Sequence, residues 1–364
     1  MEETLDNLSF IESIDKSKMA ESLEKTPEHY EKALQIAEEL ELEDLKNRKI
    51  LKVAFLGMGG SSIGGSIFKD WSYEKISVPV EICRDSIIPK HLDKHTLVFA
   101  VSYSGNTKET LDAFLQALER KCLIVGVSSG GLLGEYCKKH NVLHVQVPTG
   151  FQPRLALPYL FTVPCVILEK VGVVEGFKKE ISDAIMVLKE LREEIKTSVS
   201  SISNETKKLA LNLKGKIPII YGFREYGNVA YRLKTQLNEN SKTFCKFDVL
   251  PELNHNEIVG WEEIQPSVAK LLSVILLRDK EEPEDIRIRF EVLKEILTQK
   301  TVDIREIYGR GREKLAKMLS IIYIGDYLSF YLAILNRVDP TPVKTISFLK
   351  KELEKRLGKI NIKP

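Results

Sequence analysis

The chain has 364 residues, of which 43% are hydrophobic and 29% charged, and its formal net charge is +2 at pH 7. This length predicts about two domains, and the nearly balanced charge argues against a nucleic-acid-binding surface, which would show a clustered basic excess. The apolar runs 155–168 and 320–335 do not predict a membrane span, because prolines interrupt the first and Asp326 the second. The five cysteines are odd in number and widely spaced, so we expect reduced side chains in a soluble cytoplasmic protein.

Apolar periodicity divides the chain into four parts. Residues 1–48 read as a charged N-terminal helical segment. Residues 49–172 alternate between apolar strands and helices, which predicts a first domain with a parallel sheet and crossover helices. The strands are expected near 53–56, 78–83, 97–102, 123–127 and 143–147, and the helices near 62–71, 107–120, 131–140 and up to 170.

The second half of the chain repeats this rhythm. Residues 173–214 read as connecting helices, and residues 215–364 as a second α/β domain with added C-terminal helices. Its strands are expected near 217–221, 243–248 and 268–277, and its helices near 226–241, 283–298, 312–336 and 342–357. The predicted fold class is therefore α/β, with two parallel-sheet subdomains and additional helices at both ends of the chain.

Two turns rich in glycine and serine each join a predicted strand to a predicted helix. They are Gly57-Met-Gly-Gly-Ser-Ser-Ile-Gly-Gly65 and Ser102-Tyr-Ser-Gly-Asn-Thr107. Glycine lets the backbone approach a ligand, and free amides at a helix N-terminus favour an anion. Because neither turn carries the lysine of a nucleotide-binding loop, the pair suits a single phosphate on a small molecule. The alternative is a pair of tight turns whose glycines serve packing only.

The second turn also carries a helix-start pattern. Asn106 is followed three residues later by Glu109, which predicts that Asn106 is the N-cap of the helix 107–120. Both turns are expected at the carboxyl ends of parallel strands, where open α/β sheets bind ligands.

Three side chains outside the turns are candidates for chemistry. Glu239 shares a predicted helical face with Arg232 and Gln236, and it is either a general base or a salt-bridged residue. His255 lies in a polar loop, where histidine can exchange protons near neutral pH or be structural. Arg154 follows Gln-Pro at a helix start, where it can hold an anion or form a local ion pair. The remaining histidines and the cysteines show no metal-ligand spacing, so no metal site is expected.

Six motifs, in order along nearly the whole chain, resemble those of the bifunctional phosphoglucose/phosphomannose isomerases of the sugar isomerase (SIS) fold family. They are the two turns, Gln152-Pro-Arg154, Gln236-Leu-Asn-Glu-Asn240, Asn254-His-Asn-Glu257 and Asp339-Pro-Thr-Pro-Val343. The resemblance implies two SIS-type, flavodoxin-like subdomains. It implies interconversion of glucose 6-phosphate and mannose 6-phosphate with fructose 6-phosphate through a cis-enediol, by proton transfer without a cofactor or metal.

The resemblance also implies roles for single residues. Glu239 matches the base that moves a proton between C1 and C2, His255 matches the ring-opening residue, and Arg154 matches the group that steadies the enediolate. The positions that match substrate-binding residues, with the last three expected at the phosphate, are Gly59, Gly60, Ser61, Ser102, Ser104 and Thr107.

The C-terminal part of the site is less closely defined. A family lysine near the C-terminus assists ring opening, and its best match is Lys350, with Lys344 and Lys351 as alternatives. Tolerance of both epimers at C2 requires a small or hydroxyl side chain in this segment, for which Thr341 is a candidate.

The family further implies a homodimer whose active site lies between subunits, with the histidine supplied by the neighbouring chain. The apolar segment 319–335 offers surface for such an interface, or it is an ordinary core helix. Two other functions stay open. One is an SIS-fold isomerase of another sugar phosphate, and the other is a non-catalytic sugar-phosphate-binding regulator, which would be expected to carry a DNA-binding helix-turn-helix.

Overall fold

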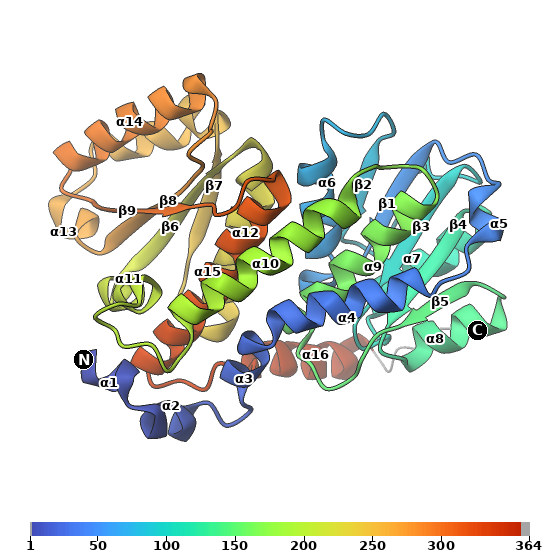
Figure 1. Ribbon diagram of the computed structural model, residues 1–364, viewed down its shortest axis with the longest axis horizontal. Coiled ribbons are helices and arrows are strands. Elements are labelled where there is room, and N and C mark those ends of the chain that lie inside the picture. The colour runs from blue at the N-terminus through green and yellow to red at the C-terminus, as the bar shows by residue number, and fades with distance from the viewer. Residues whose placement is uncertain (1, 358–364) are drawn as a thin grey trace. The chain divides into compact units, whose positions relative to one another are not determined.

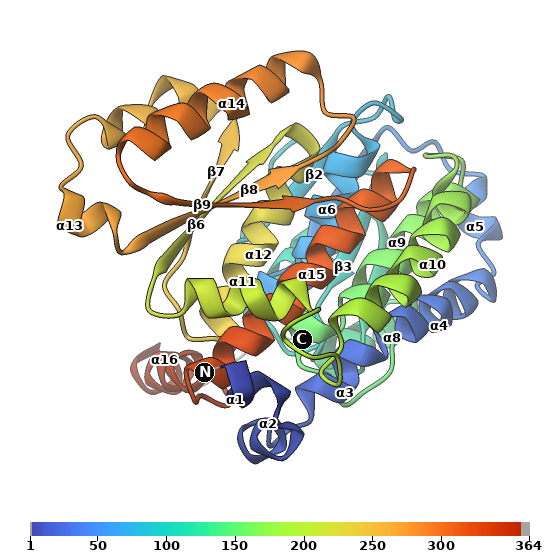
Figure 2. The ribbon, with the colours of Figure 1, turned by 60° about the vertical axis from the view of Figure 1, so that its left-hand side comes forward.

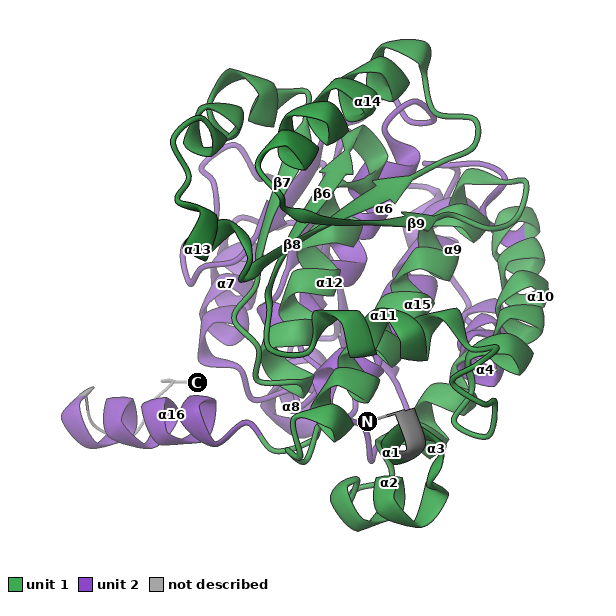
Figure 3. Ribbon diagram, turned by 90° about the vertical axis from the view of Figure 1, so that its left-hand side faces the viewer, with its two compact units in different colours: residues 1–27, 179–342 green, residues 28–178, 343–364 purple. Residues whose placement is uncertain are grey.

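The computed structural model of the protein describes the backbone of residues 2–357 and the side chains of residues 4–356 (Figure 1). The chain divides into two compact units (Figure 3). Unit 1 holds residues 1–27 and 179–342, and unit 2 holds residues 28–178 and 343–364. The expected N-terminal segment 1–48 is therefore divided between the two units, and residues 343–364 are grouped with unit 2.

Unit 2 contains a five-stranded sheet in which every strand is parallel to its neighbours. The strands are β1 (Lys52–Leu56), β2 (Val80–Cys83), β3 (Thr96–Val101), β4 (Leu123–Ser128) and β5 (Leu143–Gln146). Their order is β2-β1-β3-β4-β5, the flavodoxin-like arrangement. All six residues of β3 are buried, as expected for a central strand with helices on both faces.

The helices of unit 2 connect and cover this sheet. Helix α6 (Ile63–Ser72) joins β1 to β2, α7 (Lys108–Glu119) joins β3 to β4, and α8 (Gly131–Lys139) joins β4 to β5. The others are α4 (Thr26–Glu38), α5 (Glu43–Lys46), α9 (Leu157–Lys170), α16 (Lys344–Leu357) and the 3-10 helices η1 (Gly59–Ser61) and η2 (Pro153–Leu155). A Cβ on Gly64 of α6 would lie 2.8 Å from the Leu160 carbonyl oxygen, so glycine permits the close contact between α6 and α9.

Unit 1 contains a four-stranded parallel sheet with the order β7-β6-β8-β9. Its strands are β6 (Ile217–Phe223), β7 (Lys246–Leu250), β8 (Leu272–Arg278) and β9 (Asp303–Tyr308). Numbered along the chain, this order matches that of the first four strands of unit 2, so the two units share one topology. The α/β fold class with two flavodoxin-like, parallel-sheet subdomains is confirmed.

The helices of unit 1 include three at the N-terminus and several long elements. They are α1 (Glu2–Asp6), α2 (Leu8–Ile14), α3 (Met19–Glu24), α10 (Phe177–Ile195), α11 (Glu205–Leu213), α12 (Gly227–Asn240), α13 (Pro266–Ala269), α14 (Glu284–Gln299) and α15 (Lys314–Leu335), with the 3-10 helices η3 (Arg224–Tyr226), η4 (Glu252–His255) and η5 (Glu257–Trp261). Helix α10 begins two residues before the boundary of unit 1.

Two elements of unit 1 differ from the sequence-based expectation. Strand β9 was not expected, because polar residues follow each other in Asp303-Ile-Arg-Glu-Ile-Tyr308 and no apolar run marks it. It is an edge strand, so only its inner side pairs, with β8. The strand expected from residue 268 begins only at Leu272, because Pro266 starts a short helix, α13, in front of it.

Helix α15 is the one helix of the described residues that is long and apolar enough to span a membrane. In the most apolar 18-residue stretch of this helix, 94% of the residues are buried inside the structure. It packs against α1, α3, α11 and α12 of its own unit. The apolar surface that the sequence offered for a dimer interface is therefore covered by the chain itself, and α15 is a core helix.

A half-buried histidine supports the loop between β4 and α8. His144 Nε2 lies 2.8 Å from Ser128 Oγ, and the Ser128 hydroxyl donates to the Gly130 carbonyl oxygen at 2.8 Å. Because the hydroxyl proton is directed at Gly130, Ser128 Oγ accepts a hydrogen bond from the imidazole. Burial lowers the pKa of the His144 imidazole. All five cysteines of the chain are free thiols.

We expect the His144→Gln variant to lose part of the pH dependence of stability. The unfolded chain binds a proton near pH about 6.5 more readily than the folded chain, so acidification through this range lowers the free energy of unfolding. Urea unfolding at pH 7.5 and 5.5 should show a smaller drop for His144→Gln than for the wild type. The control is His140→Gln, which changes an exposed histidine and should behave as the wild type does. An equal drop in all three proteins would contradict the prediction.

Candidate active site

The two glycine- and serine-rich turns lie at the switch point of the unit 2 sheet. Strands β1 and β3 are neighbours, and the chain leaves β1 towards β2 on one side and β3 towards β4 on the other. In flavodoxin-like sheets the ligand binds at the carboxyl ends of these two strands. The turns that follow Leu56 and Val101 therefore occupy the position that the sequence predicts for them.

Hydrogen bonds join the two turns into one structure. The Tyr103 amide donates to Ser61 Oγ at 3.1 Å, which connects the second turn to the first. The Ser102 hydroxyl donates to Thr107 Oγ1 at 3.0 Å and closes the second turn on itself. Ser104 is exposed, and its Oγ accepts from the Asn106 amide at 3.3 Å. Serine and threonine hydroxyls from both turns thus gather at one edge of the sheet.

Two positions in the turns require glycine. Gly59 has φ +52° and Gly105 has φ +70°, in the region that L side chains rarely adopt. A Cβ on Gly105 would lie 1.8 Å from the carbonyl oxygen of Gly130, so the turn also packs against the loop before α8. The shape of the second turn therefore depends on the loop before α8.

The N-cap of α7 differs from the expectation. Thr107, not Asn106, is the N-cap residue, and its side chain makes no capping hydrogen bond. Asn106 Oδ1 instead accepts from the Leu132 amide at 3.0 Å. The prediction for Asn106 was wrong because its side chain accepts from the first turn of another helix, α8. The first amides of α7 are thus not capped by their own N-cap side chain, an arrangement in which an anion can bind.

Two arginines lie beside the first turn. A Cβ on Gly60 would lie 2.9 Å from the Arg154 amide nitrogen, so η2 touches η1 closely and brings Arg154 to the turn. Arg84 directly follows β2, and it donates to Ser62 Oγ at 3.2 Å and to Ser66 Oγ at 2.7 Å. Arg84 is not among the residues predicted from the sequence. Its position directly after the strand beside β1 was the available signal.

Unit 1 places Glu239 in the last turn of α12. Its side chain is half-buried. Lys242 Nζ donates to the Glu239 carbonyl oxygen at 2.7 Å and to the Pro340 carbonyl oxygen at 3.1 Å. The next residue, Thr341, donates its amide to Asp339 Oδ1 at 3.0 Å. The segment 339–341 therefore lies beside the end of α12, and Thr341 is brought near Glu239.

His255 lies beyond the carboxyl ends of the strands in the same sheet, opposite to the end at which Glu239 lies. It ends η4, which follows the carboxyl end of β7, and its side chain is exposed. Helix α12 starts after the carboxyl end of β6 and returns to the amino end of β7, so Glu239 lies near the amino edge. The helix rises ~18 Å between Gly227 and Glu239. Within one chain the topology thus separates Glu239 from His255.

The lysine candidates are all on α16. Lys344, Lys350 and Lys351 are exposed, so burial does not distinguish between them. In the described part of the chain no group of three or more histidine, cysteine, aspartate or glutamate side chains is placed to hold a metal ion.

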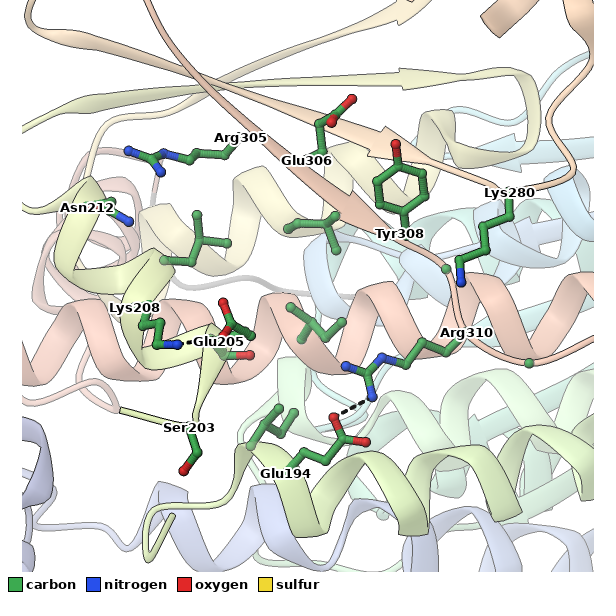
Figure 4. Close-up of a pocket in the computed structure, with 17 residues that line it drawn as sticks. Glu194, Ser203, Glu205, Lys208, Asn212, Lys280, Arg305, Glu306, Tyr308 and Arg310 are labelled. Carbon is green, nitrogen blue, oxygen red and sulfur yellow. Dashed lines mark hydrogen bonds and ion pairs between the residues drawn. The ribbon is translucent and has the colours of Figure 1, made fainter. Parts of the chain in front are cut away.

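A cavity of about 650 Å³ in unit 1 contains none of these residues (Figure 4). It is lined by the end of α10, by α11, by β9 and by the turn 309–311. Arg310 pairs with Glu194 at 2.6 Å, and Lys208 pairs with Glu205 at 2.7 Å. Because these charges compensate one another, the cavity does not indicate a ligand of either sign.

Comparisons with known proteins show which proteins this chain is similar to. The model of the bacterial phospho-glucose isomerase C-terminal SIS domain matches residues 202–353. The chain is similar to a bifunctional phosphoglucose/phosphomannose isomerase of Caldicellulosiruptor bescii, with 40% identity over 336 residues, which cover 92% of this chain and 98% of that protein. It is also similar to a D-glucosamine-6-phosphate 4-epimerase of Sulfolobus acidocaldarius, with 32% identity over 230 residues, 63% of this chain and 69% of that protein.

The fold is also found among solved structures. The crystal structure of a hypothetical protein from Thermus thermophilus matches with a TM-score of 0.71 and 16% identity, over 94% of this chain and 91% of that one. At this identity the match supports the fold alone. The relative from Caldicellulosiruptor bescii is matched over nearly its whole length, so the chain belongs to the family of bifunctional phosphoglucose/phosphomannose isomerases.

Proposed function

We propose that this protein interconverts glucose 6-phosphate and mannose 6-phosphate with fructose 6-phosphate, using Glu239 as the base. The observation that carries the proposal is the pair of joined turns in unit 2, which suits the phosphate of a small molecule. The named relative supplies the identity of the sugar. The free thiols fit a reducing compartment, and we place the protein in the cytoplasm.

The phosphate is held by Ser102, Ser104 and Thr107 together with the first amides of α7. The Ser104 and Thr107 hydroxyls and the amides donate to the phosphate, and the Ser102 hydroxyl orients Thr107 by donating to its Oγ1. The helix dipole adds a favourable field for the anion. Gly59, Gly60 and Ser61 contact the substrate through the first turn, where a side chain on Gly60 would meet the backbone at Arg154.

The reaction moves one proton from C2 to C1 and one from the C2 hydroxyl to the C1 oxygen, and it changes no oxidation state overall. Glu239 removes the proton from C2 of the open-chain aldose, the C1 carbonyl oxygen gains a proton, and a cis-enediol forms. Return of a proton to C1 and loss of one from the C2 hydroxyl give the ketose. Arg154 stabilises the negative charge that develops on the enediolate oxygens. Because both carbons belong to the substrate, no hydride carrier is required.

Both epimers are accepted when C2 can be deprotonated from either configuration. The segment at Thr341 lies beside the last turn of α12. This position supports a contact between the Thr341 hydroxyl and the sugar near C2. Ring opening requires a proton donor, for which we propose His255 and a lysine of α16, with Lys350 as the first choice.

His255 acts, in this proposal, on the site of a second copy of the chain. The fold separates it from Glu239 within one chain, and its side chain is exposed. Helix α16 exposes Ile346, Leu349 and Leu353 at positions i, i+3 and i+7, an apolar stripe that a second copy would cover. These features support the proposal of a homodimer with sites completed between subunits.

The similarity to a D-glucosamine-6-phosphate 4-epimerase favours a second candidate, an SIS-fold enzyme that acts on an amino sugar phosphate. It is distinguished by turnover of glucosamine 6-phosphate without turnover of glucose 6-phosphate. A non-catalytic regulator would bind the sugar phosphates and turn over neither.

A coupled assay on glucose 6-phosphate and on mannose 6-phosphate tests the proposal. We expect fructose 6-phosphate from both substrates, and a kcat at least about 100-fold lower for Glu239→Gln, because removing a general base costs factors of this size. The control is Glu225→Gln, which changes a carboxylate at the other end of α12 and should retain activity. Turnover by Glu239→Gln at the wild-type rate would remove the base assignment. Turnover of one substrate only would remove the tolerance at C2.

The phosphate contacts are tested with Thr107→Val. This change removes a hydroxyl that bonds Ser102 while keeping the side-chain shape. We expect KM for both sugar phosphates to rise about tenfold with a smaller change in kcat, as for loss of a hydrogen bond to a charged group. The matched control is Thr110→Val on the same helix, because the buried Thr110 hydroxyl has no hydrogen-bond partner among the described residues. Equal KM values in both variants would argue against phosphate binding by the turn 102–107.

Mixing two inactive variants tests the shared site. If His255 acts on the neighbouring chain, a dimer of one Glu239→Gln and one His255→Asn chain has one intact site. Random subunit exchange makes half the dimers mixed, so we expect about a quarter of the wild-type activity to return. The converse mixture, wild type with the Glu239→Gln, His255→Asn double variant, is the control. Its mixed dimers have no intact shared site, so about a quarter of the activity of an equal total amount of wild-type protein should remain, whereas sites within single chains would leave about half. No recovery, with mixed dimers detected by mass spectrometry, would place both residues in one chain's site.

A further inference from the structure

Asp326 is a buried carboxylate that the proposed chemistry does not use. It lies in the middle of the apolar helix α15, where the residue is 6% exposed. Buried carboxylates are rarely found without a partner. Arg232 Nη2 donates to its two oxygens at 3.1 and 2.9 Å, and Gln236 Nε2 donates to Oδ1 at 2.9 Å. Both partners belong to α12, the helix that carries Glu239.

A second buried contact connects the same two helices. The Asn240 side chain donates to Ser329 Oγ at 2.9 Å, and the Ser329 hydroxyl donates to the Asp326 carbonyl oxygen at 2.7 Å. Arg232, Gln236 and Asn240 are spaced by four residues and form one stripe along α12. The network therefore runs from the middle of α12 to the residue next to Glu239.

The helices approach closely at this network. Helices α12 and α15 lie side by side (Figure 2). A Cβ on Gly325 would lie 2.4 Å from Leu233 Cδ1, so the residue before Asp326 leaves room for α12. Apolar packing alone tolerates small shifts between two helices, whereas a buried ion pair is satisfied in one register only. The charged contact thus specifies how the two helices align.

We propose that Asp326 is a positioning residue for Glu239. Through Arg232, Gln236 and the Ser329–Asn240 contact it fixes the rotation and the axial position of α12, and with them the direction of the Glu239 side chain. A slip by one residue would rotate Glu239 by about 100° and move it about 1.5 Å along the axis. The inference rests on the proposed function in one respect, the assignment of Glu239 as the base.

The decisive variant replaces the whole network by apolar groups. In the triple variant Asp326→Leu, Arg232→Met, Gln236→Leu no unpaired charge remains, so thermal stability should be equal to or above that of the wild type. We expect kcat to fall about 100-fold, as a displacement of 1 Å can produce, while KM changes little because the phosphate is held in unit 2. A purely structural role predicts a wild-type kcat in the stable variant, which would overturn the proposal.

A conservative change and a matched control keep the test sharp. Asp326→Asn keeps an acceptor for Gln236 and should fold, with a kcat between those of the wild type and the triple variant. Tyr331→Phe removes another buried contact of α15, the hydrogen bond from the Tyr331 hydroxyl to the Ile195 carbonyl oxygen at the end of α10. We expect it to lose stability and keep kcat. An equal loss of kcat in Tyr331→Phe and Asp326→Asn would show a general effect of α15 and contradict the proposal.

A readout independent of activity separates this inference from the proposed function. If Glu239→Gln retains wild-type turnover, the assignment of Glu239 as the base fails. The alignment of α12 with α15 can still be measured in that case. A crystal structure of the triple variant should then show α12 rotated or shifted relative to α15. The wild-type register in that structure would overturn the positioning role of Asp326.

Discussion

The hydrogen bond from the Tyr103 amide to Ser61 Oγ holds together two turns that come from different strand–helix connections. Its geometry depends on β1 and β3 being neighbours, because only then do the two carboxyl ends meet. The second turn packs against the loop at Gly130, which Ser128 and the half-buried His144 hold in place. The polar site is therefore preorganised by a sequence of contacts that ends in the apolar sheet, and it does not rely on a ligand for its shape.

The two units share one strand order but use the switch point differently. In unit 2 the crevice beyond β1 and β3 holds glycines and hydroxyls. In unit 1 the corresponding position beyond β6 and β8 is filled by charged and aromatic side chains. Tyr226 donates its hydroxyl to Asp279 Oδ2 at 2.9 Å, and Lys317 pairs with the other oxygen of the same carboxylate. The second sheet thus supplies functional candidates from its edges and helices, while its crevice is closed by an internal network.

The sequence was sufficient where one local signal decided the outcome. The buried strands, the glycine turns and the long helices were predicted because apolar runs and glycine positions mark them directly. Strand β9 was missed because an edge strand needs no apolar run, and Asn106 was misassigned because its partner, Leu132, is distant in sequence. The separation of Glu239 and His255 follows from the direction in which α12 crosses the sheet, and no local motif predicts that direction. The pairing of Arg232 with Asp326 likewise joins residues far apart in sequence, so no motif predicts it.

Helix α15 has a consequence for the chain before it has folded. In the native structure Asp326, near the middle of the helix, is paired with Arg232 of α12. Before folding this contact has not formed, and the segment resembles a membrane-spanning helix in length and composition. A charge near the centre of such a segment disfavours its insertion into a bilayer by about 2.5 to 3.5 kcal/mol. The carboxylate that is paired in the finished core thus also disfavours entry of the newly made segment into lipid.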